Sequence, residues 1–140
     1  MSDAAELARE IERLFTALVR EGARLGLDES PALTPTQRSA LAALVDDGPL
    51  RLGALADAIA TTDATATRTV QALERLGLVE RAPDAADGRG VLLAATPEGK
   101  RVVASARRRL RQSVARLIRD GDDRERLAEL LRDLTGAVAR

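Results

Sequence analysis

One interruption in a helical pattern of apolar residues most constrains how this chain can fold. Two short apolar runs, at residues 78–82 and 91–95, flank a turn-rich segment at 83–90, and this arrangement predicts a β-hairpin with a long tip. In the rest of the chain, apolar side chains recur at intervals of three and four residues, which indicates amphipathic helices. At 140 residues, the chain can build one domain with a core but not two ordinary ones. We therefore expect a mainly α fold with a small β-hairpin.

Local start and stop signals predict where the helices lie. Thr34, Pro35 and Gln37 form a capping-box pattern, Thr62 can cap a later helix, and Thr96 again precedes a first-turn proline. Glycine, proline and acidic residues mark the ends. The predicted order is a long helix that ends near residues 22–26, a loop at 28–31, a helix from 35 that stops at 47–49, a short helix over 52–59, a helix over 63–77, the hairpin, a long helix from 97, a break at 120–123 and a last helix that reaches 138.

The helix that begins at residue 63 has two different faces. At 100° per residue, small and apolar side chains fall on one face and polar ones on the other. The inner set is Ala66, Val70, Leu73 and Gly77, and the outer set is Ala64, Arg68, Gln71 and Arg75. Two short helices followed by a hairpin are the elements of a winged helix-turn-helix, in which the second helix enters the major groove. A plain helical bundle with an incidental hairpin is the alternative.

Composition excludes several classes of function. The chain has no Cys and no His, which removes disulfides, thiol chemistry, the usual zinc ligands and the usual nucleophile–base pairs. Its only aromatic residue, Phe15, offers no platform for stacking single-stranded bases, so a nucleic-acid partner would be a duplex. There is no Gly-rich phosphate loop and no metal-ligand spacing. We expect no enzyme activity, no catalytic residue, no metal and no cofactor.

Targeting signals are also missing from the pattern. The first ten residues lack a basic and then apolar leader, and no apolar run approaches the roughly 18 residues that a bilayer span needs. We therefore expect a cytoplasmic protein with no membrane partner.

Several spaced motifs between residues 33 and 100 occur together. They are Leu33-Thr34 with Gln37, Leu55-Ala56, Thr67-Arg68, Leu73-Glu74, Gly77-Leu78-Val79 with Arg81, Asp87 with Arg89, and Thr96 with Gly99. In this combination the chain resembles the MarR family of bacterial winged helix-turn-helix transcription regulators. The resemblance implies a homodimer that binds a pseudo-palindromic operator in double-stranded DNA, acts as a repressor, and is released by a small-molecule effector where one is used. It also implies an N-terminal dimerisation helix at 1–32, a DNA-binding winged helix-turn-helix at 33–99 and C-terminal dimerisation helices at 100–140, all within one structural domain.

The candidate DNA contacts lie at helix starts, on the outer face of the recognition helix and in the wing. Arginine suits guanine, glutamine suits adenine, and Thr or Ala can contact a thymine methyl group. Residues at the starts of the second and third helices are candidates for phosphate contacts. A solvated face whose charges pair with nearby acids is the alternative. The predicted DNA-binding set is Thr36, Arg38, Arg51, Thr62, Ala64, Thr65, Thr67, Arg68, Gln71, Arg75, Asp87 and Arg89.

In the wing, Asp87 precedes Arg89 by two residues. In an extended hairpin both side chains would point to the same face, so the carboxylate could hold the guanidinium in a fixed pose. The resemblance implies that Arg89 enters the minor groove, where an arginine is favoured by the negative potential. The alternative is an exposed ion pair of little value. Gly88 and Gly90 stand where many relatives are basic or polar, which predicts a more flexible wing and weaker binding.

Charge is unevenly placed although 22 basic residues balance 22 acidic ones. Residues 1–30 hold four Arg against seven acids, and residues 100–119 hold eight basic residues and no acid. This asymmetry favours pairing between the first and fifth helices in the dimerisation region over direct DNA contact by the basic run. That run is Arg107, Arg108, Arg109 and Arg111.

Two further hypotheses follow from the resemblance. An effector pocket would lie where the first, second and fifth helices meet the winged region, with Phe15, Leu18, Leu41 and Val103 as candidate lining residues, each of which could equally be ordinary core. The functional alternative is a winged-helix protein-interaction or dimerisation module that does not bind DNA sequence-specifically. Retention of Arg68, Asp87 and Arg89 favours DNA binding.

Overall fold

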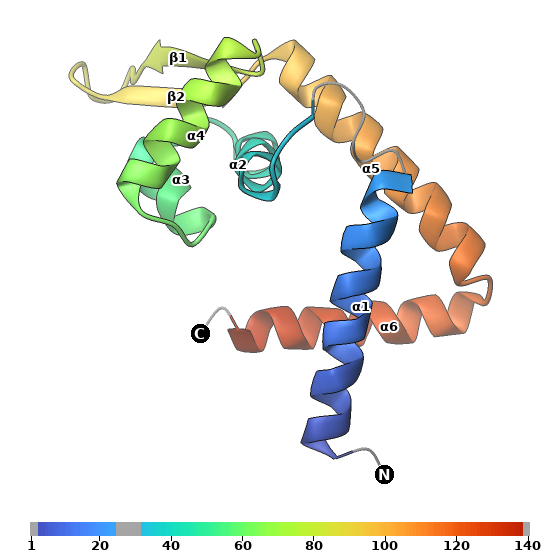
Figure 1. The fold of residues 1–140 in the computed structure, drawn as a ribbon. Coiled ribbons are helices and arrows are strands. Elements are labelled where there is room, and N and C mark those ends of the chain that lie inside the picture. Colours follow the sequence, from blue (N-terminus) through green and yellow to red (C-terminus); the bar gives the residue numbers. More distant parts are fainter. Residues whose placement is uncertain (1–2, 25–31, 139–140) are drawn as a thin grey trace.

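The computed structural model describes residues 3–24 and 32–138. Within them lie six helices and a two-stranded antiparallel hairpin, which confirms the predicted mainly α fold with a small wing (Figure 1). The predicted loop at 28–31 lies outside the described residues. The elements are α1 (Ala4–Arg24), α2 (Pro35–Asp46), α3 (Leu52–Ala58), α4 (Asp63–Arg75), β1 (Val79–Pro83), β2 (Val91–Ala95), α5 (Pro97–Leu117) and α6 (Gly121–Val138).

The predicted helix starts are confirmed at atomic detail. The Thr34 hydroxyl accepts the backbone N–H of Gln37 at 3.2 Å, and the Gln37 side chain accepts the N–H of Thr34 at 3.0 Å, which completes the capping box of α2. Thr62 caps α4 by accepting the N–H of Thr65 at 3.2 Å, and Thr96 caps α5. Each cap satisfies N–H groups that have no partner inside the helix.

The predicted break between the last two helices is misplaced. It was expected at residues 120–123, whereas α5 ends at Leu117 and α6 already begins at Gly121. The Asp120 carboxylate accepts the backbone N–H groups of Asp122 at 2.8 Å and Asp123 at 3.2 Å. The acidic cluster therefore starts a helix, because carboxylates are favoured at the positive end of the helix dipole.

The hairpin is held to the segment before α3 by backbone hydrogen bonds. Its strands pair from Val79 opposite Ala95 to Pro83 opposite Val91, one residue later than predicted on the first strand. Leu50, before α3, forms two backbone hydrogen bonds with Leu93 of β2, at 3.0 and 2.8 Å. The wing is thus fixed to the start of the helix-turn-helix.

The junction between the hairpin and α5 is closely packed. The Thr96 hydroxyl donates to the carbonyl of Gly77 at 2.7 Å, and the Thr96 N–H donates to the carbonyl of Leu78 at 3.0 Å. A Cβ at Gly99 would lie 2.2 Å from the Leu78 carbonyl oxygen, so only glycine fits without movement. α5 is therefore joined directly to the end of α4.

The buried core lies between residues 33 and 103. It is built from one face of α2, α3 and α4, from the hairpin and from the first turns of α5. Its cluster of buried hydrophobic residues is Leu33, Ala40, Leu41, Leu44, Leu55, Val70, Leu73, Leu78, Val79, Leu93, Ala95 and Val103.

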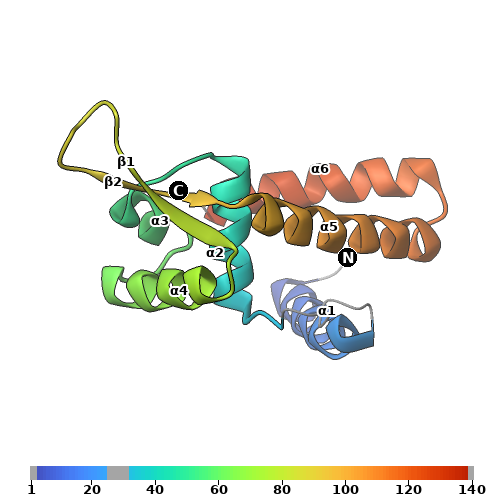
Figure 2. The ribbon, with the colours of Figure 1, turned by 90° about the horizontal axis from the view of Figure 1, so that it is seen from above.

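The remaining helices extend away from this winged core. α1, the far half of α5 and α6 lie to one side of it, and α6 folds back after the bend at residues 118–120 (Figures 1 and 2). α6 has no buried residue. None of the described helices is long and apolar enough to cross a membrane. The exposed large apolar side chains on these three helices are Leu7, Ile11, Leu14, Leu110, Val114, Leu117, Leu127, Leu130, Leu131, Leu134 and Val138.

Candidate nucleic-acid interface

The two faces predicted for α4 are confirmed within the helix, but the placement of Gly77 on the inner face is wrong, because Gly77 is exposed and lies past the end of α4. Ala66, Val70 and Leu73 are fully buried, and the outer residues Ala64, Arg68, Gln71 and Arg75 are all exposed. Gly77 lies just past the helix with φ at +73°, a conformation that favours glycine. α4 therefore packs on the core along one side and leaves the other side open to a partner.

Sequence reasoning missed one buried member of the inner face. Thr69 is buried, and its hydroxyl donates to the carbonyl of Thr65 at 2.8 Å. This bond satisfies the hydroxyl inside the helix, so a polar residue can occupy a core position. Thr69 lies three residues after Ala66, and this helical spacing could have predicted its place on the inner face.

Two of the threonines predicted to contact DNA, Thr62 and Thr67, already use their hydroxyl protons. Thr62 donates to the Thr65 hydroxyl at 3.1 Å, and Thr67 donates to the carbonyl of Asp63 at 2.8 Å. Thr62 is exposed, and Thr65 and Thr67 are half-buried. Thr62 and Thr67 can still offer a duplex their methyl groups and acceptor lone pairs, whereas the Thr65 hydroxyl accepts from Thr62 and keeps its own proton to donate.

The arginines on the outer face of α4 are exposed and can bind a partner. Within the described part of the chain, Arg68 and Arg75 form no ion pair, whereas Glu74, beside Arg75, accepts a hydrogen bond from Arg81 of β1 at 2.9 Å. Glu74 is thus paired with an arginine of the wing and not with Arg75. The two exposed guanidinium groups are placed to donate to phosphates or base edges.

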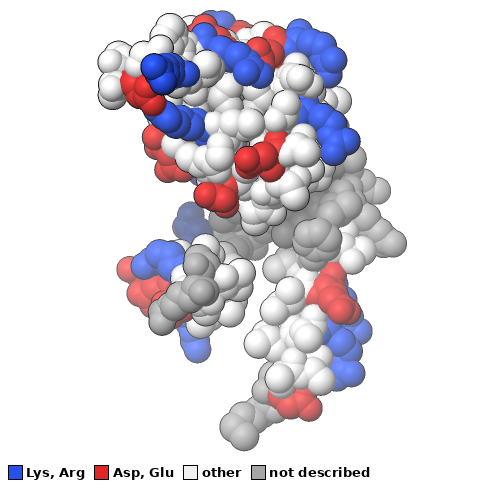
Figure 3. Space-filling model, turned by 90° about the vertical axis from the view of Figure 1, so that its left-hand side faces the viewer, with Lys and Arg blue, Asp and Glu red and all other residues white. Residues whose placement is uncertain are grey.

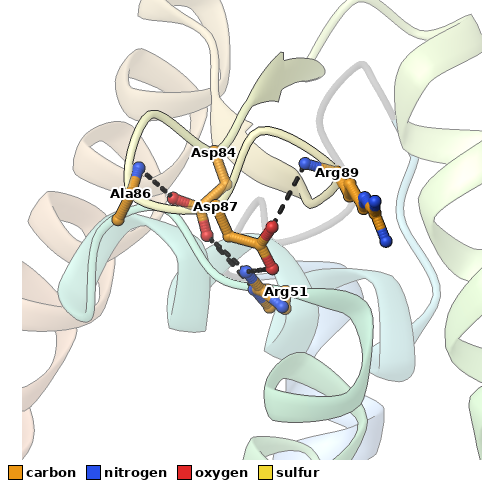
Figure 4. Close-up of polar contacts among 5 residues, drawn as sticks. All are labelled: Arg51, Asp84, Ala86, Asp87 and Arg89. Carbon is orange, nitrogen blue, oxygen red and sulfur yellow. Dashed lines mark hydrogen bonds and ion pairs between the residues drawn. The ribbon is translucent and has the colours of Figure 1, made fainter.

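At the wing tip, the predicted pairing of Asp87 with the Arg89 guanidinium is wrong. The tip forms consecutive turns. Residues two apart, such as Asp87 and Arg89, therefore do not point to the same face as they would in an extended strand. The Asp87 carboxylate instead accepts the backbone N–H of Arg89 at 3.2 Å, and the Arg89 side chain extends away from it (Figure 4).

The aspartates of the tip bind an arginine from another element. Arg51, which immediately precedes α3, donates from Nη2 to Asp84 at 2.7 Å and to Asp87 at 3.0 Å, and from Nε to Asp84 at 3.2 Å (Figure 4). Hydrogen bonding to Arg51 lowers the pKa of both carboxyl groups and raises the pKa of Arg51. All three groups therefore stay charged at neutral pH.

Gly90 has a packing role that its sequence context did not reveal. A Cβ at this position would lie 2.7 Å from Nη2 and 3.0 Å from Cζ of Arg51. The glycine makes room for the guanidinium, which offers a reason for its presence other than flexibility.

The remaining predicted residues lie at several places. Thr36 is exposed at the start of α2, and Arg38, two residues further on, is half-buried. Leu41 and Val103 are buried in the winged core, whereas the side chains of Phe15 and Leu18 lie outside the described part of the chain. No cluster of three or more acidic side chains that could hold a metal ion occurs in residues 3–24 and 32–138.

One arginine of the basic run on α5 pairs with α2. Arg107 donates from both Nη atoms to the Asp46 carboxylate at the end of α2, at 2.8 and 2.7 Å. This hydrogen bonding lowers the pKa of Asp46. Arg107 therefore joins α5 to α2, and the predicted pairing of the whole run with the first helix stays a prediction. Arg109 donates to the Ser105 hydroxyl at 3.0 Å.

The winged part carries mixed charge on the face that Figure 3 shows. Basic and acidic side chains alternate over it, and no single continuous basic patch forms. A charged partner would therefore be positioned by individual arginines more than by a broad field.

An exposed recognition helix beside a hairpin wing, both on a helix-turn-helix core, defines a winged helix-turn-helix DNA-binding protein. The sequence model of the MarR family matches residues 33–90. An HTH-type transcriptional regulator from Mycobacterium bovis is 33% identical over 126 residues, covering 89% of this chain and 82% of the relative. The chain belongs to the MarR family of transcription regulators, whose members are not enzymes.

Solved structures share this fold over nearly the whole chain. A MarR family protein from Bacillus stearothermophilus has a TM-score of 0.80 and 25% identity, covering 97% of this chain and 95% of that one. Streptococcus pneumoniae FabT, solved in complex with DNA, has a TM-score of 0.79 at 19% identity and covers 97% of each chain.

Proposed function

We propose that this protein is a homodimeric repressor that binds a pseudo-palindromic operator in double-stranded DNA. The recognition helix α4 enters the major groove, and Arg89 of the wing reaches the flanking minor groove. The observation that carries the proposal is the outer face of α4, where Arg68, Gln71 and Arg75 are exposed beside a wing whose Arg89 extends outward. FabT, which has a related fold, was solved in complex with DNA, and this supports DNA as the partner.

The apolar faces outside the core support a dimer. Exposed leucine, isoleucine and valine side chains line α1, the far half of α5 and α6. No residue of α6 is buried within its own chain. Apolar surface of this extent is stable in water only when it is covered. A second copy related by two-fold symmetry covers it with the same surface. The proposed division is thus a winged region at 33–99 and dimerisation helices at 1–32 and 100–140.

The test of operator binding is a titration against the DNA upstream of the protein's own and neighbouring coding regions, at two salt concentrations. We expect footprints over two half-sites about one helical turn, roughly 10 base pairs, apart. Affinity should fall as salt rises, because phosphate contacts release counterions. A single asymmetric half-site, or no protection anywhere, would contradict the proposal, and the second outcome would favour a protein-interaction module.

Repression is tested separately from binding. Transcription from a promoter that contains the protected site should fall when the protein is added to purified polymerase. Unchanged or increased transcription at full occupancy of the site would contradict the repressor role. Release by an effector is tested in the same assay with candidate small molecules, and restored transcription is the expected result.

A further inference from the structure

Arg51 was predicted to contact DNA, but its position in the winged region is poorly explained by such a contact. It precedes α3, yet its guanidinium is bound to two carboxylates that lie 33 and 36 residues later in the chain. The Asp84 side chain is 14% exposed and the Arg51 side chain 50%, so the carboxylate, but not the guanidinium, is largely covered. An arginine already held by two acids is a poor candidate for a phosphate contact, because binding a phosphate would require it to leave them.

Each aspartate uses its two oxygens differently. Asp84 accepts the N–H of Ala86 with one oxygen, at 3.0 Å, and binds Arg51 with the other. Asp87 likewise accepts the N–H of Arg89 with one oxygen and binds Arg51 with the other. The same two carboxylates therefore shape the backbone of the tip and join it to the start of α3.

The backbone of the tip closes on itself around these side chains. Asp84 donates its N–H to the carbonyl of Gly90 at 2.9 Å, and Gly90 donates to the carbonyl of Asp87 at 2.9 Å. Gly90 also leaves the space that the Arg51 guanidinium fills. A side chain at Gly90 would therefore require the Arg51 guanidinium to shift from its place between the two aspartates.

We propose that Arg51 is a positioning residue that acts through Asp84 and Asp87 to fix the wing tip in the orientation that presents Arg89 to DNA. We refer to Arg51, Asp84 and Asp87 as the wing clamp. The inference rests on the proposed DNA-binding function. A tip that is already ordered loses less conformational freedom when the operator binds, so the wing clamp strengthens binding without touching the duplex.

Asp84→Asn distinguishes this role from a phosphate contact. If Arg51 bound phosphate, removing a competing carboxylate would release it and remove a negative charge near DNA, and operator binding would tighten. The wing clamp predicts the opposite, a loss of about three- to tenfold in affinity with little change in the salt slope. Tighter binding by Asp84→Asn would overturn the proposal.

Glu80→Gln is the matched control. Glu80 is an exposed acid of β1 in the same hairpin, and within the described residues it forms no ion pair. Its replacement removes one negative charge and leaves the wing clamp intact, so its affinity should stay the same or rise slightly. A loss as large as that of Asp84→Asn would show that any acid of the hairpin matters equally and would overturn the wing clamp.

Hydrogen exchange of the free protein tests the wing clamp without DNA. The amides of Ala86, Arg89 and Gly90 should exchange faster in Arg51→Ala and Asp84→Asn than in the wild type, while amides in α4 keep their rates. Unchanged exchange at the tip would overturn the proposal. If the wild type binds no operator, the proposed function fails, and the exchange rates still decide whether Arg51 orders the tip.

A double mutant adds a second criterion for Arg51 itself. Arg51→Ala should cost little further affinity in a protein that already carries Arg89→Ala, because the wing clamp acts through the Arg89 contact. Arg51→Lys should restore only part of the binding, since the single nitrogen of an ammonium can replace the Nη2 contacts with both carboxylates but not the added donation from Nε to Asp84. Full additivity with Arg89→Ala would identify Arg51 as an independent contact and contradict the positioning role.

Discussion

At the scale of single residues, Gly99 shows how closely α5 approaches the hairpin. Gly99→Ala places a Cβ 2.2 Å from the Leu78 carbonyl oxygen, and backbone must move to accept it. We expect a loss of about 1–3 kcal/mol in the free energy of unfolding, the usual range for overpacking, measured by urea denaturation.

Gly53→Ala is the control for that substitution. Gly53 lies in α3, and an added Cβ there meets nothing within 4 Å. Alanine at this site should be neutral or stabilise the protein by up to about 1 kcal/mol, because glycine is a poor helix former. If both variants lost equal stability, the close approach at Gly99 would not be the cause.

Replacing Arg68 and replacing Arg89 should change DNA binding in different ways. Arg68→Ala should relax discrimination at particular operator positions, with about 1–3 kcal/mol at stake for a bidentate base contact. Arg89→Ala should weaken binding to all operator variants by a similar factor, because the minor groove distinguishes little beyond A·T from G·C. Affinities for a panel of single-base operator variants provide the measurement, and identical profiles for the two mutants would contradict the assignment of grooves.

At the scale of elements, the ion pair between Arg107 and Asp46 joins α5 to α2. Because the pKa of Asp46 is lowered in the folded protein, its stabilising effect is present above the unfolded-state pKa of about 3.9 and is lost as pH falls through the folded-state value. Asp46→Asn should therefore be less stable than the wild type at pH 7, and the difference should shrink in acid below about pH 4.

Thermal denaturation at neutral and acidic pH measures this difference. Asp47→Asn is the matched control, since Asp47 is the adjacent acid and forms no ion pair among the described residues. A deficit of Asp46→Asn that stays constant across this pH range would rule out the carboxylate as its source.

The elements differ in how far the sequence alone predicts them. The starts of α2, α4 and α5 were predictable, because each depends on a threonine within three residues of the N–H that it caps. The two faces of α4 follow from helical spacing in the same way. The partners of Asp84 and Asp87 were not predictable, because Arg51 lies more than thirty residues away and reaches them only through the folded hairpin. Local rules correctly placed Arg89 in the wing, but they assigned its guanidinium a partner on the assumption of an extended strand.

At the scale of the whole molecule, the exposed apolar faces make assembly testable by one substitution. Leu134→Asp places a charge on the exposed apolar face of α6, where Leu134 is 52% exposed. We expect a monomer of about half the wild-type mass by sedimentation at micromolar concentration, with loss of operator affinity and an unchanged winged core. Arg132→Asp puts the same residue on the opposite face of the helix and should leave the mass unchanged. A Leu134→Asp protein that sediments as the wild type does would exclude α6 from the interface.

The close junction at Thr96 and Gly99 couples the orientation of α5 to that of α4. The helix has 21 residues, so at about 1.5 Å per residue it is about 30 Å long. Since its first turn is bonded to the residues that follow α4, a displacement of about 5 Å at its far end corresponds to a rotation of about 10° at α4. In the proposed dimer, two recognition helices rotated by such angles would no longer match the spacing of successive major grooves. Small shifts among the outer helices would then produce a large change in the fit to DNA.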